Sequence, residues 1–295
     1  MNDKSKTLCY TIAVRAKHPD LEKKGCLLTM KNPLYARGLR LWAQGLLFLA
    51  LRWAQLKSGF DPVTGLSRRS VPGMILVAAI LFCAAAELVL CRRIPGGKRT
   101  YLNCLEPIGQ RSLAPLAAGS LLLCAGAVLL PGWGALSIAA AVTGAAAAAG
   151  LLLFARLLRR GDVPKAFHLL PAMVFTVIFV LAVYLPEEGN PVLARFYLPV
   201  LAAAMASCAF YHLAGLTCRE GSLRWFVLLG DLAVPLCLAS AADCTGDLGK
   251  LLVYLGFALV LTVFLLTRRD EVLPEPERDA GQPADPDAQA ARPQD

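Results

Sequence analysis

The stretch PGMILVAAILFCAAAELVLC at 72–91 carries one charged side chain, Glu87, in twenty residues. A helix of about 20 apolar residues is long enough to cross the roughly 30 Å hydrocarbon core of a bilayer. Other apolar blocks of similar length precede and follow it, separated by short charged stretches, and together they occupy most of residues 39–267. The sequence therefore predicts an all-α, polytopic transmembrane helix bundle with about eight spans.

The ends of the apolar blocks set the expected spans. Pro72, Pro131 and Pro186 stand at block edges, where proline commonly begins or ends a helix. We expect helices near 39–56, 72–91, 113–130, 135–157, 166–185, 194–216, 223–241 and 249–267.

Charge is the second signal. The chain has a formal net charge of +9, is 57% hydrophobic and has a mean hydropathy of +0.55. With a cytoplasmic N-terminus, cytoplasmic segments hold 24 of the 30 Lys and Arg residues and outer loops hold five. Cytoplasmic loops normally carry this excess, so both termini are predicted to be cytoplasmic. Because the basic residues cluster at block ends and do not interleave with exposed aromatic residues, nucleic acid is not an expected partner.

The first block is the doubtful span. It contains Arg40, Gln44, Arg52 and Gln55, and basic residues follow it in a loop expected outside. The alternative is an amphipathic helix lying in the membrane interface, which gives seven spans and moves the N-terminus to the outer side.

The two ends of the chain differ from the middle. Residues 1–38 form a basic segment, expected to be cytoplasmic, and organised sequence begins after Met30, so residues 1–29 are expected to be disordered or absent from the natural protein. Residues 268–295 are acidic and rich in proline, which predicts a disordered cytoplasmic tail. Residues 39–267 form the predicted transmembrane domain.

Small residues indicate where helices pack closely. Gly144, Ala148 and Ala141 share a face of the fourth block, and Gly119 and Gly126 share a face of the third. Helices in lipid associate through such small faces. The short connection PGWG predicts that these two helices form a tight antiparallel hairpin.

Ionisable residues inside the blocks are the candidate binding residues, because a charge in a bilayer is costly and usually functional. Glu87, His168, His212 and Asp231 all fall in the cytoplasmic half of the predicted bundle. The sixth and seventh helices are joined by a short loop, so a His212–Asp231 pair is geometrically feasible and would titrate near neutral pH. Pro235, one turn beyond Asp231, would kink that helix.

Enzymatic chemistry is not expected. The ten cysteines contain no CxxC spacing and several lie within apolar blocks, so we expect reduced thiols and neither a metal site nor a cofactor. A paired nucleophile and base, a Walker motif and a GxGxxG motif are also missing from the sequence.

Two functions remain open. The first is a non-enzymatic component of the cell membrane, which acts with a membrane protein partner or as a homo-oligomer in the lipid bilayer. The short loops are typical of a bacterial multi-pass membrane protein, so we expect the bacterial cytoplasmic membrane. The second is a secondary transporter that uses Asp231 and His212 for a small solute.

Overall fold

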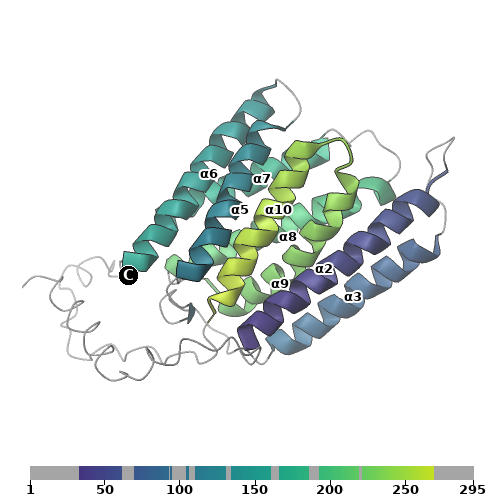
Figure 1. Ribbon diagram of the computed structural model, residues 1–295, viewed down its shortest axis with the longest axis horizontal. Coiled ribbons are helices and arrows are strands. Elements are labelled where there is room, and N and C mark those ends of the chain that lie inside the picture. The colour runs from purple at the N-terminus through teal and green to yellow at the C-terminus, as the bar shows by residue number, and fades with distance from the viewer. Residues whose placement is uncertain are drawn as a thin grey trace, which may run out of the picture. The chain divides into compact units, whose positions relative to one another are not determined.

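In the computed structural model, the described residues are 33–61, 70–92, 94, 104–105, 110–130, 134–160, 166–185, 193–218 and 221–268. They form eight α-helices and two short 3-10 helices (Figure 1). The α-helices are α2 (Pro33–Ser58), α3 (Val71–Cys91), α5 (Gln110–Val128), α6 (Ala135–Arg160), α7 (Leu170–Tyr184), α8 (Leu193–Thr217), α9 (Leu223–Ser240) and α10 (Leu248–Leu266), and the 3-10 helices are η2 (Ala166–His168) and η4 (Ala241–Asp243). The all-helical fold and the eight helices are confirmed.

The chain divides into two compact units, Met1–Arg37 and Gly38–Asp295. The second unit holds Gly38–Ser58 of α2 and all of the other helices. The expected start at Met30 lies outside the described residues, as does all of the expected tail at 268–295 except Arg268. An isolated antiparallel bridge joins Leu105 to Arg268.

Six helices of this unit close into a ring. Each consecutive pair from α5 to α10 is in contact, and α10 returns to contact α5. The ring interior is filled by aromatic side chains. Phe179 of α7 meets both Tyr254 and Phe257 of α10 edge-on, at centroid distances of 5.2 and 5.6 Å. Phe154, Phe175, Phe210 and Phe264 extend the same buried cluster. We call α5–α10 the six-helix ring.

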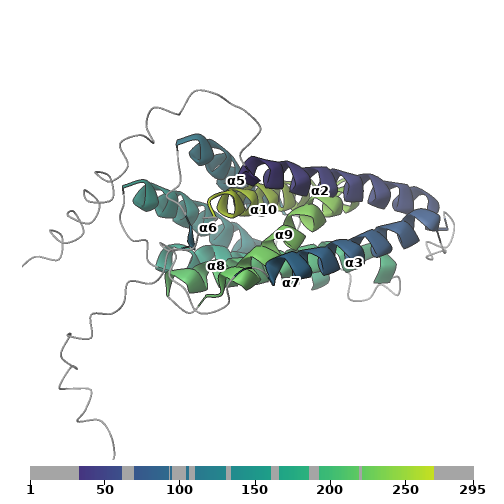
Figure 2. The same ribbon diagram turned by 90° about the horizontal axis from the view of Figure 1, so that it is seen from below.

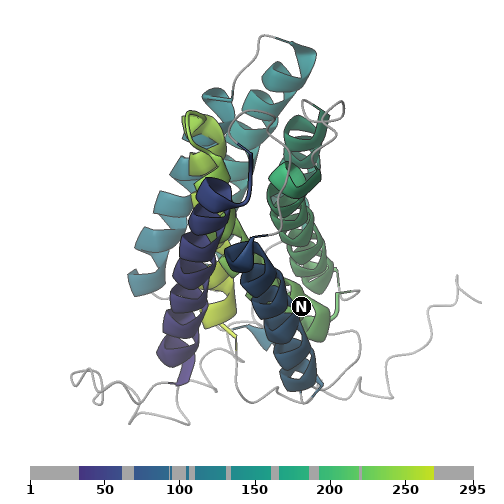
Figure 3. The ribbon, with the colours of Figure 1, turned by 90° about the vertical axis from the view of Figure 1, so that its right-hand side faces the viewer.

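The first two helices form a hairpin, α2–α3, that packs on one side of the six-helix ring (Figure 3). Figure 2 shows α2 and α3 nearest at the end where their loop joins them and apart at the other end. At the loop end, Ser70 caps α3 by accepting a hydrogen bond from the Gly73 N–H at 3.3 Å, and a Cβ on Gly73 would lie 2.9 Å from Gln55 Nε2. At the other end, Arg40 of α2 pairs with Glu87 of α3 at 2.7 Å.

One face of α2 is buried along the helix. The spacing of its buried residues alternates between three and four, as in a coiled-coil seam, which keeps them on one face. They are Gly38, Leu41, Gly45, Phe48, Arg52 and Gln55, and Gly59 continues the spacing just after the helix. Gly45 has no room for a Cβ, because Leu238 of α9 occupies the space. Trp42 Nε1 donates a hydrogen bond to Thr262 Oγ1 of α10 at 3.2 Å, so α2 packs against both α9 and α10.

Glycines set the closest helix contacts inside the ring. An added Cβ on Gly126 of α5 would lie 2.8 Å from the Gly249 carbonyl of α10, and one on Gly119 would lie 2.8 Å from Val260. The glycines of α5 therefore face α10. Gly144 of α6 instead abuts Ala127 of α5 and Phe175 of α7. The expected α5–α6 hairpin is present as a contact between these helices, but the glycine face of α5 lies on a different neighbour.

Five helices are long and apolar enough to cross a membrane: α3, α6, α8, α9 and α10. Shorter apolar helical stretches lie at 112–128 and 170–184. The described part of the chain thus has the composition of a membrane-embedded protein. Helix α2, which contains several basic and amide side chains, is not among these apolar helices.

Candidate functional site at the boundary between hairpin and ring

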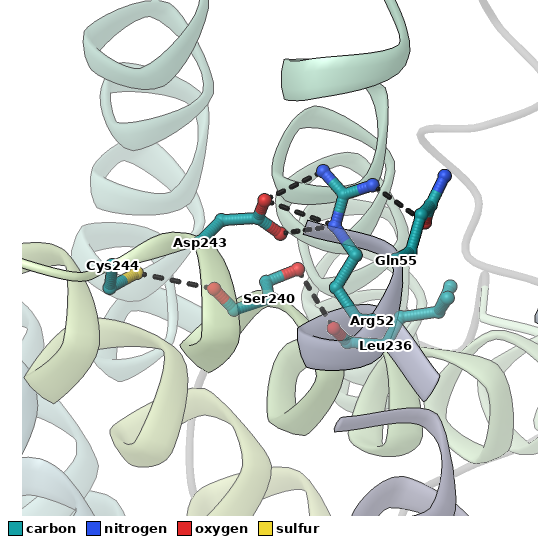
Figure 4. Close-up of polar contacts among 6 residues, drawn as sticks. All are labelled: Arg52, Gln55, Leu236, Ser240, Asp243 and Cys244. Atoms are coloured by element: carbon teal, nitrogen blue, oxygen red, sulfur yellow. Dashed lines mark hydrogen bonds and ion pairs between the residues drawn. The ribbon is translucent and has the colours of Figure 1, made fainter. Parts of the chain in front are cut away.

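The principal buried charge lies where the hairpin meets the six-helix ring. The Arg52 side chain has no exposed surface, and that of Asp243 is 9% exposed. Arg52 Nη2 donates to Asp243 Oδ1 at 2.6 Å, and Nε lies 3.0 Å from both carboxylate oxygens (Figure 4). Nη1 donates to Gln55 Oε1 at 2.9 Å. This fork-to-fork geometry is the strongest form of an Arg–carboxylate contact.

Tyr197 of α8 completes what we call the Arg52 cluster: Arg52, Gln55, Asp243 and Tyr197. The guanidinium carbon of Arg52 lies 5.4 Å from the Tyr197 ring centroid, within range of a cation–π contact. The cluster thereby joins α2, α8 and the end of α9. Its charges sum to zero, and its polar atoms fix helices against one another.

Local sequence explains how Asp243 reaches this place. α9 ends at Ser240, and the 3-10 turn η4 carries Asp243 back over α2. Gly246 then takes a φ of 95°, a left-handed conformation that favours glycine, and lets the chain reverse. Asp247 caps α10 by accepting from the Lys250 N–H at 3.0 Å.

Cys244 lies beside the cluster. Its Sγ donates to the Ser240 carbonyl at 3.3 Å, and Ser240 Oγ in turn donates to the Leu236 carbonyl at 2.8 Å (Figure 4). Burial, reinforced by the carboxylates of Asp243 and Asp247 and opposed by Lys250, raises the pKa of the Cys244 thiol to about 12. The thiol is therefore a neutral, weakly nucleophilic group at physiological pH.

Asp231 and His212, two of the residues that the sequence singled out, lie in different surroundings. Asp231 is buried in α9, with 1% of its surface exposed. It precedes Leu238 by seven residues, so both lie on the α9 face whose Leu238 contacts Gly45 of α2. The ring of His212 packs edge-on to Tyr211, with centroids 5.4 Å apart. Within the described residues, the two side chains form no hydrogen bond or ion pair with each other, so the pair that the sequence made feasible is not formed.

Glu87 and His168 each contact a neighbouring side chain. The Glu87 side chain is 6% exposed and its carboxylate pairs with Arg40, so it joins α3 to α2. His168 is the last residue of η2, and its ring lies edge-on to Phe167. The packing residue Ala148 is buried on α6, as is Gly144.

The sequence signalled two members of the Arg52 cluster, Arg52 and Gln55, and missed Asp243 and Tyr197. Arg52 stood out as a charge inside an apolar block, whereas Asp243 sits in a turn segment, AADCTGD, that reads as an ordinary loop. The two residues are 191 positions apart. Such a pair can be sought in a sequence as two opposite charges, one within a span and the other at the end of a later span.

No protein-family model, curated protein or solved structure matches this chain. Within the described ranges, no group of three or more His, Cys, Asp or Glu side chains is arranged to hold a metal ion.

Proposed function

We propose that the chain is a multi-pass integral protein of the cell membrane that crosses the bilayer eight times, with both termini in the cytoplasm, and that it acts as a non-enzymatic component together with a membrane partner. The observation that carries the proposal is how the buried polar groups are used. Arg52, Asp243 and Gln55 join helices to each other, and aromatic side chains fill the six-helix ring. This arrangement supports a structural role.

The Arg52 cluster also supports α2 as the eighth span. Arg52 reaches Asp243 beside the ring and Gln55 lies between Arg52 and the start of α3, while Leu46, Leu47 and Trp53 are exposed on the other side of the helix. Lys57 Nζ lies 3.7 Å from the Trp53 ring centroid, near the end of α2. Tryptophan and lysine at the end of a helix are typical of the membrane interface.

Helix α3 offers the surface for a partner. Of its most apolar stretch, 17% is buried, against 78% for that of α9. Phe82 and Leu81 project from it with 74% and 65% of their surfaces exposed. Without a partner this face contacts lipid, and it can accept a transmembrane helix from another chain without disturbing the ring.

The test is affinity purification of the protein from native membranes in mild detergent, followed by identification of co-purifying chains. We expect a membrane protein, or a second copy, to co-purify with the wild type and to be lost from Leu81→Ala/Phe82→Ala. The matched control is Ile138→Ala/Val142→Ala, which truncates two exposed residues on α6. If both double variants retain the same partners as the wild type, α3 is not the docking surface.

A second candidate function is secondary transport of a small solute. A carboxylate buried in the middle of an apolar helix, Asp231 in α9, favours it, as does Pro235 four residues later. Since aromatic residues fill the ring, a transport path would run along the α9 face toward α2. Asp231→Asn should then abolish solute flux into proteoliposomes, or remove a pH-dependent shift in melting temperature. Unchanged flux and unchanged pH response in this variant would exclude Asp231 as the transport residue.

A further inference from the structure

Arginine side chains gather at one end of the helix bundle. Figure 1 shows α3, α6 and α10 ending at the same, lower end, and α9 begins there because it runs antiparallel to its neighbour α10. Arg92 follows the last residue of α3, and Arg156 and Arg159 lie near the end of α6. These three are exposed, and Arg224, the second residue of α9, is half-buried. We call these four residues the arginine face.

The arginine face retains its positive charge. At the opposite end of the bundle, Asp243 and Asp247 each pair with a basic side chain. In the half of the bundle that holds the arginine face, the described carboxylates are those of Glu87 and Asp231, and both residues are buried. Within the described residues, no member of the arginine face forms an ion pair, so an anionic group is needed to neutralise it.

The acidic segment 269–295 leaves the bundle beside this face. The Thr267 N–H donates to the Val263 carbonyl at 3.1 Å, and Arg268 forms an antiparallel bridge with Leu105, which is 1% exposed. These contacts fix the point from which the segment starts. In the six-helix ring α10 lies between α5 and α9, while α6 packs on α5 and α3 packs on α9. The starting point therefore lies between the arginines of α6 and those of α9 and α3.

The segment 269–295 has the charge to bind the arginine face and the length to reach it. It contains eight acidic and three basic residues. A flexible chain of about 27 residues has a root-mean-square end-to-end distance of about 26–31 Å. Two helices that pack on a common neighbour have axes at most about 16–20 Å apart. Exposed Arg–carboxylate pairs are individually weak, but a tether of this length holds the carboxylates at an effective concentration in about the millimolar range.

We propose that the acidic segment 269–295 docks on the arginine face of its own chain, as an intramolecular contact that keeps other anionic ligands away from this face. The segment is the occupant because it starts between the arginines and carries the complementary charge. The contact weakens as the ionic strength rises, since exposed charges are screened over about 8 Å at physiological salt. This proposal goes beyond the proposed function and does not depend on the number of spans.

A protease that cleaves after glutamate tests the contact in the full-length chain. The protein is placed in nanodiscs of phosphatidylcholine, which has no net charge, and cleavage after Glu277 is followed by mass spectrometry at low ionic strength. We expect cleavage about tenfold slower than in a synthetic peptide of residues 269–295, because a tethered segment is mostly bound. Arg156→Gln/Arg159→Gln should restore most of the peptide's rate. The matched control, Lys57→Gln/Lys250→Gln at the opposite end of the bundle, should leave the slow rate unchanged.

The variants separate docking from shielding of the segment by the nanodisc. Shielding slows cleavage equally in the wild type, the arginine variant and the control, whereas docking is lost from the arginine variant alone. Added salt should also raise the wild-type rate relative to the peptide in the same buffer. If Glu277 of the wild type is cleaved at the peptide's rate, or the arginine variant is protected as fully as the wild type, the inference is overturned. Equal loss of protection in the control would show an effect of net charge alone and would overturn it too.

Discussion

At the residue scale, Asp243 is the carboxylate that forms an ion pair with the buried Arg52. Removing one partner of a buried ion pair leaves the other uncompensated and costs about 3–5 kcal/mol. We therefore expect Asp243→Asn to lower the melting temperature of the detergent-solubilised protein markedly. Asp247→Asn should change it little, because asparagine caps a helix about as well as aspartate and the Asp247–Lys250 pair is partly exposed. Differential scanning fluorimetry measures both, and equal losses in the two variants would contradict a special role for Asp243.

Cys244 gives a prediction about pH. Burial is the largest cause that raises the pKa of its thiol from 9.0 to about 12, so the reactive thiolate is scarce at pH 8. We expect iodoacetamide to alkylate Cys244 far more slowly than the exposed Cys218, with a rate that still rises with pH above 10. Because the folded-state pKa is raised, the thiol contributes stability below pH 9 that is lost as the pH rises toward 12. Mass spectrometry of the labelled peptides decides the matter, and similar rates at pH 8 would show that Cys244 is accessible and ionised.

At this scale, the sequence identified some of the buried polar residues but not their partners. Asp231 and Glu87 were identified as ionisable groups within apolar blocks, and both are buried. Their partners could not be derived, because a helical pattern defines the face of a residue and leaves open which helix lies opposite. Arg52 was read as evidence against a span for the same reason. Its neutralising partner lies in a turn whose position depends on the assembled ring.

At the element scale, the α5–α10 contact depends on glycine. An added Cβ at Gly126 would lie 2.8 Å from both the Gly249 carbonyl oxygen and the Val253 nitrogen, so backbone atoms would have to move. We expect Gly126→Ala to destabilise the protein by about 1–3 kcal/mol, the usual range for overpacking. Gly134→Ala is the control, since nothing lies within 4 Å of its added Cβ. Thermal unfolding in detergent compares the two, and a Gly126→Ala variant as stable as the control would show that α5 and α10 can separate without loss.

The elements themselves were largely predictable. Block length and proline positions gave helix ends within a few residues for α3, α6, α8 and α10, because crossing a bilayer fixes how long an apolar helix must be. α2 begins earlier, at Pro33, than the apolar block suggested, since its first turns are basic. The partner of the α5 glycines was not predictable from a short α5–α6 connection. Closure of the ring by α10, far along the chain, decided it.

At the scale of the whole molecule, the number of spans determines where the chain ends lie. A chain that crosses eight times has both termini on one side, whereas seven crossings put them on opposite sides. With about 1.5 Å per residue, the 26-residue α2 is about 39 Å long, which exceeds the roughly 30 Å hydrocarbon core. Its charged Arg52 is buried against Asp243, whereas Leu46, Leu47 and Trp53 face outward, so α2 is suited to span the bilayer beside the ring.

We therefore expect epitope tags placed after Met1 and before Asp295 to be protected together from protease in intact spheroplasts and to become accessible together on permeabilisation. An internal control is a protease site inserted in the loop after Tyr184, which the eight-span topology places outside. Cleavage at that site in intact spheroplasts shows that the protein is inserted and reachable. If the N-terminal tag is cleaved in intact spheroplasts while the C-terminal tag is protected, the chain crosses an odd number of times. α2 then lies in the interface, and Arg52 and Asp243 would form a pair at the membrane surface.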